Sequence, residues 1–104
     1  YMNYLLILCT TVSNKYCAEK IARKLLNDKL AACVSIKEIN SFYLWDEMIQ
    51  NNSEYEVNIK SKPEKLDSLI EFLKIEIGYE IPQIIYKKFD SEKSYYEWVE
   101  KSMN

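Results

Sequence analysis

The chain has 104 residues, of which 48% are hydrophobic and 29% are charged, and its formal net charge is −2. This length suits one domain, residues 1–104, because two halves would have cores too small to be stable. A net charge this small, with Lys and Arg spread along the chain, argues against nucleic-acid binding, and no apolar run approaches the roughly 20 residues that cross a bilayer.

The first predicted elements are a strand followed by an amphipathic helix. Residues 3–11 place apolar side chains on both faces of an extended chain, which predicts a central strand covered on both sides. Ser13 or Asn14 is expected to cap the helix by accepting a hydrogen bond from a free backbone N–H. Apolar residues recur at helical spacing, opposite a charged face, at Ala18, Ile21, Ala22, Leu25 and Leu26.

Two strands that pair as a long hairpin are predicted next. Residues 30–36, continued by residues 41–45, have no helical period, and residues 54–60 alternate apolar and polar side chains. The polar residues 46–53 are expected to hold the turn between the two strands. The alternation points three apolar side chains of the second strand inward, namely Tyr55, Val57 and Ile59.

A second helix, a fourth strand and a last helix complete the predicted order. Pro63 suits a first helical turn, where its missing N–H costs nothing, and Gly78 ends the helix because it tolerates positive φ. Residues 81–89 are predicted to form a strand, in which Pro82 favours an edge position. Ser91 is expected to cap the last helix. The order βαββαβ plus a C-terminal helix predicts an α+β, ferredoxin-like sandwich.

The two apolar faces of the first strand predict an oligomer. In a ferredoxin-like fold the two main helices cover one face of the sheet and leave the other face open. Because the first strand is apolar on both faces, we expect another copy of the chain to cover the open face. The aromatic residues at positions 42–45 are better explained by a subunit interface than by base stacking, which requires basic residues between the rings.

The composition also restricts the chemistry. The chain has no His, which removes the commonest general base and the commonest transition-metal ligand. A single Gly excludes a glycine-rich phosphate loop, and a Cys or Ser nucleophile would lack a base, so we expect no enzymatic activity. Lys60 and the carboxylate pairs Asp46/Glu47 and Glu54/Glu56 are explained more simply as solvated charges.

The three cysteines are Cys9, Cys17 and Cys33. Their odd number and irregular spacing do not suit a disulfide framework. Because free cysteines are typical of reducing compartments, we expect a cytoplasmic location. Cys9 and Cys33 lie on the first two predicted strands, and thiolates bind soft ions such as Cu(I). Without a third donor, both cysteines are explained more simply as inert buried thiols. Tyr1 before Met2 suggests the remnant of a trimmed targeting segment.

Six short motifs occur in a specific order and spacing between about residues 5 and 98. They are Leu8-Cys9-Thr10, residues 30–36 (LAACVSI), residues 41–46 (SFYLWD), Glu56 with residues 59–61 (IKS), residues 79–85 (YEIPQII), and Tyr95 with Trp98. No single motif is decisive. Together they resemble the CutA family of divalent-ion tolerance proteins over nearly the whole chain.

The resemblance implies an assembly and a set of site residues. It implies a homotrimer, similar in architecture to the PII signalling proteins, whose long β-hairpins wrap onto neighbouring subunits. It also implies association with copper or other divalent cations. The residues implied for an inter-subunit pocket and interface, like the PII effector site, are Cys33, Tyr43, Trp45, Lys60, Glu80 and Trp98.

The sequence departs from the family pattern at the metal ligands. Copper sites proposed in the family use a cysteine that matches Cys9 and a histidine pair whose positions are Glu76 and Ile77 here. Cys9 with Glu76 combines a soft and a hard donor, so we expect a copper or other divalent cation to bind weakly. The usual Gly-Lys of the hairpin turn is replaced by residues 47–48, which leaves the geometry of that turn open.

Two functions from different classes follow from these observations. The first is a trimeric CutA-like protein that binds divalent cations weakly and contributes to the response to metal ions. The alternative is a PII-like, non-enzymatic signalling or scaffold trimer. That trimer would bind an unidentified small molecule or protein partner at the inter-subunit cleft.

Overall fold

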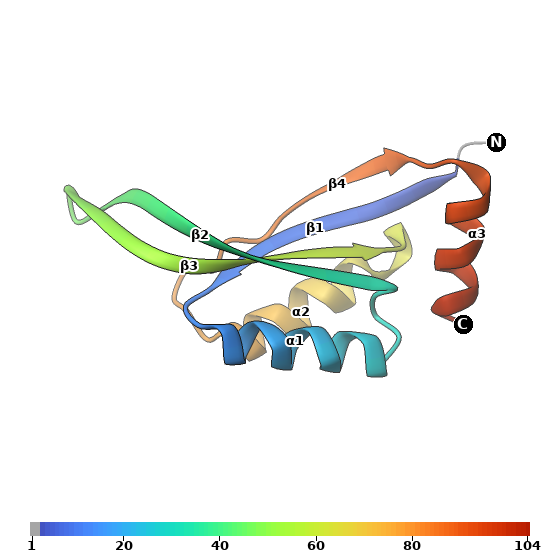
Figure 1. Cartoon of the computed structure of the whole chain (residues 1–104), viewed down its shortest axis with the longest axis horizontal. Helices are drawn as coiled ribbons and strands as arrows, with labels where there is room; N and C mark the ends of the chain where they lie inside the picture. The colour runs from blue at the N-terminus through green and yellow to red at the C-terminus, as the bar shows by residue number, and fades with distance from the viewer. Residues whose placement is uncertain (1–2) are drawn as a thin grey trace.

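The computed structural model describes residues 3–104, so Tyr1 and Met2, with the suggested targeting remnant, lie outside the described residues. Strands and α-helices follow one another in the predicted order (Figure 1). Their bounds are β1 Tyr4–Val12, α1 Lys15–Asn27, β2 Cys33–Trp45, β3 Met48–Ser61, the 3-10 helix η1 Pro63–Lys65, α2 Leu66–Ile77, β4 Ile85–Asp90 and α3 Lys93–Ser102. Among these residues no helix is both long enough and apolar enough to span a membrane.

The four strands form one antiparallel sheet in the order β2-β3-β1-β4. Strand β1 is central, because its Leu8 pairs with Ile59 of β3 on one side and with Tyr86 of β4 on the other. This arrangement confirms the α+β, ferredoxin-like fold and the edge position of the fourth strand. That strand begins at Ile85, so Pro82 precedes it and does not lie within it as predicted.

Helices α1 and α2 lie on one face of the sheet and form the main core with it (Figure 1). Their apolar stripes meet the even-numbered side chains of β1. The buried side chains of this core include Leu6, Leu8, Val12, Ala18, Ile21, Leu25, Val57, Ile59, Leu69 and Leu73. The helical spacing predicted this face correctly, except that Leu26 is 44% exposed. We call this side of the sheet the covered face.

The other side is the open face, which carries Leu5, Ile7, Cys9 and Thr11 of β1 and the residues paired with them. Helix α3 covers only the end of this face, where Val99 and Met103 pack on Leu5. The rest of the open face has no covering layer within the described part of the chain. The expectation that two helices cover one face and leave the other open is therefore confirmed.

Local chemistry sets the ends of α1 and α2. The side chain of Asn14 accepts a hydrogen bond from the N–H of Cys17 at 2.8 Å, so Asn14 is the N-cap of α1. Gly78 ends α2 with a φ of 71°, in the left-handed region that favours glycine. Pro63 opens η1, and α2 itself begins three residues later, at Leu66.

Helix α3 is capped by Glu92 and not by the predicted Ser91. The Glu92 carboxylate accepts hydrogen bonds from the N–H groups of Ser94 and Tyr95 at 2.9 and 3.1 Å. The backbone N–H of Ser91 instead donates to the carbonyl of Asn3 at 2.9 Å. The carboxylate reaches further than a hydroxyl and carries the negative charge that a helix N-terminus favours.

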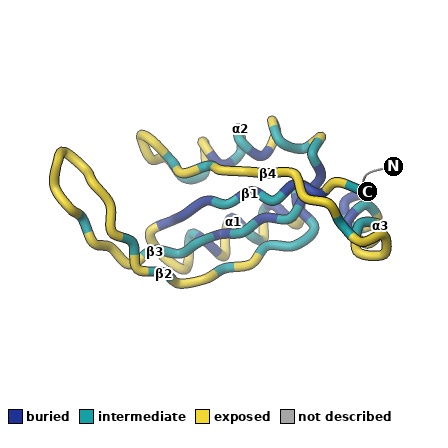
Figure 2. Tube along the Cα trace, turned by 90° about the horizontal axis from the view of Figure 1, so that it is seen from above, coloured by how far each residue is buried: buried dark blue, intermediate teal, exposed yellow. Residues whose placement is uncertain are grey.

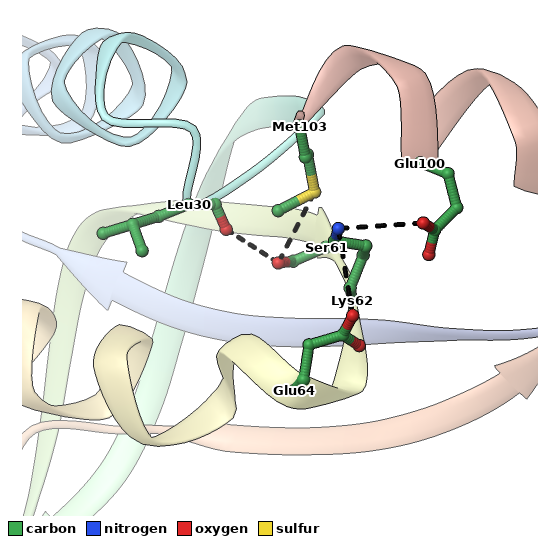
Figure 3. Close-up of polar contacts among 6 residues, drawn as sticks. All are labelled: Leu30, Ser61, Lys62, Glu64, Glu100 and Met103. Carbon is green, nitrogen blue, oxygen red and sulfur yellow. Dashed lines mark hydrogen bonds and ion pairs between the residues drawn. The ribbon is translucent and has the colours of Figure 1, made fainter.

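A buried lysine joins the end of β3 to α3 (Figure 3). Lys62 is only 7% exposed, and its ammonium lies 3.8 Å from carboxylate oxygens of both Glu64 and Glu100. Glu64 belongs to η1 and Glu100 to α3, so one positive charge holds three segments together. Beside this group, the Ser61 hydroxyl donates to the carbonyl of Leu30 at 2.7 Å.

The β2–β3 turn is tighter than the sequence predicted. Strand β3 begins at Met48, so the turn consists of Asp46 and Glu47 and does not extend over residues 46–53. Both turn residues have positive φ, 52° and 62°, as a two-residue type I′ hairpin turn requires. The prediction was wrong because residues 50–53 are all polar. A strand that is exposed to solvent on both faces does not show the alternation of apolar and polar residues by which strands are predicted.

Beyond Tyr55 the hairpin projects from the sheet as a two-stranded arm, residues 39–54 (Figure 1). The register explains the arm, because Tyr55 pairs with Val12 at the end of β1, while β2 and β3 stay paired to the turn. The arm is exposed over most of its length (Figure 2). Its apolar side chains include Phe42, Leu44 and Ile49, which are 68%, 71% and 75% exposed.

The Glu92 cap predicts that the stability of α3 depends on pH. The hydrogen bonds from Ser94 and Tyr95 lower the pKa of the Glu92 carboxyl below its ordinary value of 4.5. This stabilisation is therefore complete above that value and is lost as the pH falls through the lowered pKa. Amide protection factors of residues 94–98 should fall between about pH 5 and pH 3.

Glu92→Gln should remove this pH dependence, whereas Glu97→Gln on the exposed side of α3 should retain it. The measurement is hydrogen exchange by NMR, normalised to the intrinsic exchange rate at each pH. An unchanged pH dependence in the Glu92→Gln variant would contradict the role of the cap.

The Lys62 group predicts a second effect on α3. Lys62→Ala should lower the free energy of unfolding by about 1–2 kcal/mol, because it leaves two carboxylates facing each other. Lys101→Ala on the exposed face of α3 is the matched control, with an expected change within about 0.5 kcal/mol. Urea unfolding measures both variants, and equal losses in the two would show that the buried position of Lys62 is irrelevant.

Candidate functional site

A cavity of about 660 Å³ lies at the base of the arm, on the open face of the sheet. Three separate segments form its walls: the end of β1, the two strands of the arm, and the loop between α2 and β4. The residues that line it are mainly aromatic and acidic, and they include Phe42, Tyr43, Trp45, Tyr79, Glu54 and Glu80. We call it the arm cavity.

Strand alternation delivers the arm side chains to the cavity. Ser41, Tyr43 and Trp45 are alternate residues of β2, so their side chains share one face of the arm. Tyr43 pairs directly with Gln50 of β3, which also lines the cavity. The amide of Asn52 donates a hydrogen bond to the Tyr43 hydroxyl, which holds the ring against the arm.

The loop that follows Gly78 supplies the opposite wall. Gly78 turns the chain out of α2, and Tyr79, Glu80 and Gln83 then line the arm cavity. The side-chain amide of Gln83 also lies 4.0 Å from the Cys9 sulfur. Glu80 additionally lines a smaller cavity of about 370 Å³, together with side chains of α2 such as Lys74.

The structure brings three of the six predicted pocket residues together. Tyr43, Trp45 and Glu80 line the arm cavity. Cys33 and Lys60 pair with each other at the start of β2, and ten residues of strand, about 33 Å, separate Cys33 from Tyr43. Trp98 lies in α3, with its ring stacked on Tyr95 at a centroid distance of 5.6 Å. Within one chain, the six residues do not form a single site.

The two predicted metal ligands lie on opposite sides of the sheet. Cys9 follows Leu8, which faces α1 and α2, so its side chain belongs to the open face. Glu76 lies in α2 and forms an ion pair of 2.7 Å with Lys24 of α1. Among residues 3–104, no three or more His, Cys, Asp or Glu side chains cluster closely enough to hold a metal ion.

The surroundings of Cys9 favour its protonated form. Burial raises the pKa of the Cys9 thiol, and the negative charge of Glu56 raises it further. A metal ion binds the thiolate and must displace the proton, so this environment opposes metal binding at neutral pH. Cys9, Cys17 and Cys33 are all free thiols.

The sequence did not predict Gln50, Tyr79 and Gln83 as cavity residues, and Glu54 was expected only as a solvated charge. Gln50 was assigned to the turn, so its pairing with Tyr43 could not be anticipated. A turn placed at Asp46-Glu47 would have set this register from the sequence. Tyr79 and Gln83 lie within the motif at residues 79–85, but no local signal says which strand that loop approaches.

Comparisons with known proteins agree with the six motifs. Residues 6–102 match the family model described as CutA1 divalent ion tolerance protein. The chloroplastic protein CutA 1 of Oryza sativa subsp. japonica is 32% identical over 99 residues, which cover 93% of this chain and 56% of that protein. The chain thus spans about half the length of the plant relatives that it matches.

Bacterial relatives match over more of their length. The divalent-cation tolerance protein CutA of Yersinia pestis (strain Pestoides F) is 28% identical over 105 residues, which cover 99% of this chain and 87% of that protein. The structure of CutA from Synechococcus elongatus PCC7942 superposes with a TM-score of 0.92 at 32% identity, covering 98% of this chain and 92% of that one. Because sequence and fold agree over nearly its whole length, this chain belongs to the CutA1 family of divalent ion tolerance proteins.

Proposed function

We propose that the chain contributes to the tolerance of divalent cations. The observation that carries this proposal is the match of residues 6–102 to the CutA1 family, together with the name of the Yersinia relative. These names favour tolerance over the alternative of a PII-like signalling or scaffold trimer. We further propose that the chain acts by binding and not by catalysis, because it contains no His to serve as a base.

The working form that we propose is a homotrimer. Its support is apolar surface that one chain leaves uncovered, both on the arm and on the open face. Ile85 pairs with Cys9 and is 58% exposed, while Leu44 and Ile49 form a cross-strand pair on the arm, both more than 70% exposed. Leu44 and Ile49 lie on the face of the arm opposite to Tyr43, so neighbouring copies packed both on the open face and against the arm would be needed to bury both surfaces. The number three rests on the family resemblance.

The proposed compartment is the cytoplasm. Its support is the free state of Cys9, Cys17 and Cys33, because unpaired thiols persist most readily in a reducing environment. Relatives differ in this respect, since the plant relatives are named chloroplastic.

The trimer proposal predicts the mass of the particle in solution. Light scattering at micromolar concentration should give three times 12.4 kDa, about 37 kDa. Ile49→Glu should reduce the mass towards that of one chain, because it places a charge in the proposed interface. Ile75→Glu is the matched control, since Ile75 is similarly exposed, at 73%, but lies on α2. A mass of one chain for the unchanged protein would refute the proposed assembly.

We propose that copper or another divalent cation binds weakly, with Cys9 as the soft ligand. Glu76 would have to leave Lys24 to bind the same ion, and it lies across the sheet from Cys9. We therefore expect Glu76 to add less than Cys9 to the affinity. Glu76 remains a predicted ligand that is tested separately.

Calorimetry with Zn(II) and with Cu(I), under reducing conditions, measures this binding. Cys9→Ser should abolish uptake, whereas Glu76→Gln, across the sheet from Cys9, and Cys17→Ser on α1 should leave it nearly unchanged. Uptake should also weaken as the pH falls, because the raised pKa keeps the Cys9 thiol protonated. Equal uptake by the Cys9→Ser variant and the unchanged protein, or no uptake at all, would refute metal binding at Cys9.

A further inference from the structure

We propose that the arm cavity is a site shared between copies of the chain, and that Lys60 of a neighbouring copy completes it. The inference rests on the proposed assembly and adds the direction in which the copies pack. The end of one open face that carries Lys60 meets the end of the next open face that carries Glu54 and Glu80. The order of the charged residues along the open face supports this arrangement.

Lys60 lies where a copy packed on the open face would enclose it. It belongs to β3, an inner strand of the sheet, and pairs with Cys33 of β2 and with Ile7 of β1. Neither neighbour is acidic, and Lys60 takes part in no ion pair among residues 3–104. Lys60 is already half-buried in the single chain. A fully buried ammonium group without a counter-charge is strongly destabilising, so an assembled Lys60 requires a carboxylate.

Two other lysines that the strands place on this face have less need of such a partner. They are Lys37 of β2 and Lys87 of β4, both on edge strands. Lys37 pairs directly with Glu56, which offsets its charge, and the Lys87 ammonium lies 5.8 Å from the centre of the Phe89 ring. Both lysines are exposed, and the rim of an interface stays accessible to water. Lys60 is therefore the lysine that requires a carboxylate from another copy.

The acidic end of the open face lacks the corresponding cation. Glu54 pairs with Ile39, and Glu80 belongs to the loop after α2. Both line the arm cavity, which no Lys or Arg among residues 3–104 lines, and neither takes part in an ion pair among those residues. Six residues of extended strand, about 20 Å, separate Glu54 from Lys60 of the same chain. The cation must therefore come from another copy.

Packing of copies on the open face must join its unlike ends. If like ends met, uncompensated charges of one sign would be enclosed together, which repulsion and lost hydration oppose. If Lys60 of one copy enters the arm cavity of the next, the ammonium group and the carboxylates of Glu54 and Glu80 compensate one another. Each copy then gives one such contact and receives one, as a closed assembly of identical chains requires.

Charge reversal tests this contact by light scattering at micromolar concentration. Lys60→Glu should lower the particle mass towards 12.4 kDa, the mass of one chain, because it faces a negative charge with Glu54 and Glu80 of the neighbour. Adding Glu54→Lys or Glu80→Lys to Lys60→Glu should restore the assembled mass in at least one of the two pairs. Such a rescue reports a contact between copies, since Lys60 forms no ion pair with either carboxylate within the chain.

Exposed charges of α1 provide the matched controls. Lys20→Glu alone should leave the mass unchanged. Lys60→Glu combined with Glu19→Lys has the same net charge as the rescuing variants but should stay dissociated. Lys60→Gln is a milder change for the case in which a reversed charge prevents folding. It should raise the protein concentration at half-assembly by at least about tenfold, with the far-UV circular dichroism unchanged.

Three results would overturn this inference and leave the proposed assembly intact. One is that Lys60→Glu and Lys60→Gln both assemble like the unchanged protein. Another is that neither Glu54→Lys nor Glu80→Lys restores the mass of the Lys60→Glu variant. The third is that Glu19→Lys restores it equally well, which would show that only net charge matters. A single-chain mass for the unchanged protein would instead overturn the assembly and this inference together, so the two failures are distinguishable.

Discussion

Strands β2 and β3 remain hydrogen bonded from Cys33 and Lys60 to Trp45 and Met48, whereas β1 pairs with β3 only as far as Tyr55. This difference in length creates the arm. A two-stranded ribbon alone is marginally stable in water, and this one carries apolar side chains on its surface. The exposed apolar side chains of the arm are the surface that the proposed trimer would bury, and the base of the arm forms a wall of the arm cavity.

The two faces of the sheet differ in what packs on them. The covered face packs on α1 and α2 and contains the main core, which stabilises the single chain. The open face is covered by α3 only near Leu5, where the Lys62 group holds that helix in place. The main core is thus on one side of the sheet, and most of the other side stays uncovered in the single chain.

The chemistry of the open face separates two kinds of site. Cys9 lies there as a single soft donor whose proton is held by burial and by Glu56. The arm cavity lies beyond it and offers two carboxylates among aromatic rings. A single thiol suits a soft metal ion, whereas the residues that line the arm cavity include no thiol.

The sequence by itself determined the order of elements, the central position of β1 and the main core, because these follow from local periodicity and from residues such as Gly78. Its motifs also determined the family. Only the tertiary structure decided that Tyr43, Trp45 and Glu80 meet in one cavity while Lys60, Cys33 and Trp98 lie elsewhere. The alternation of side chains along a strand tells which face of the sheet a residue lies on. Which residues of the next strand lie beside it depends on the register in which the two strands pair. A two-residue turn at Asp46-Glu47 sets that register. The sequence did not reveal this turn, because the polar strand residues that follow it are exposed on both faces of the arm and resemble a longer turn.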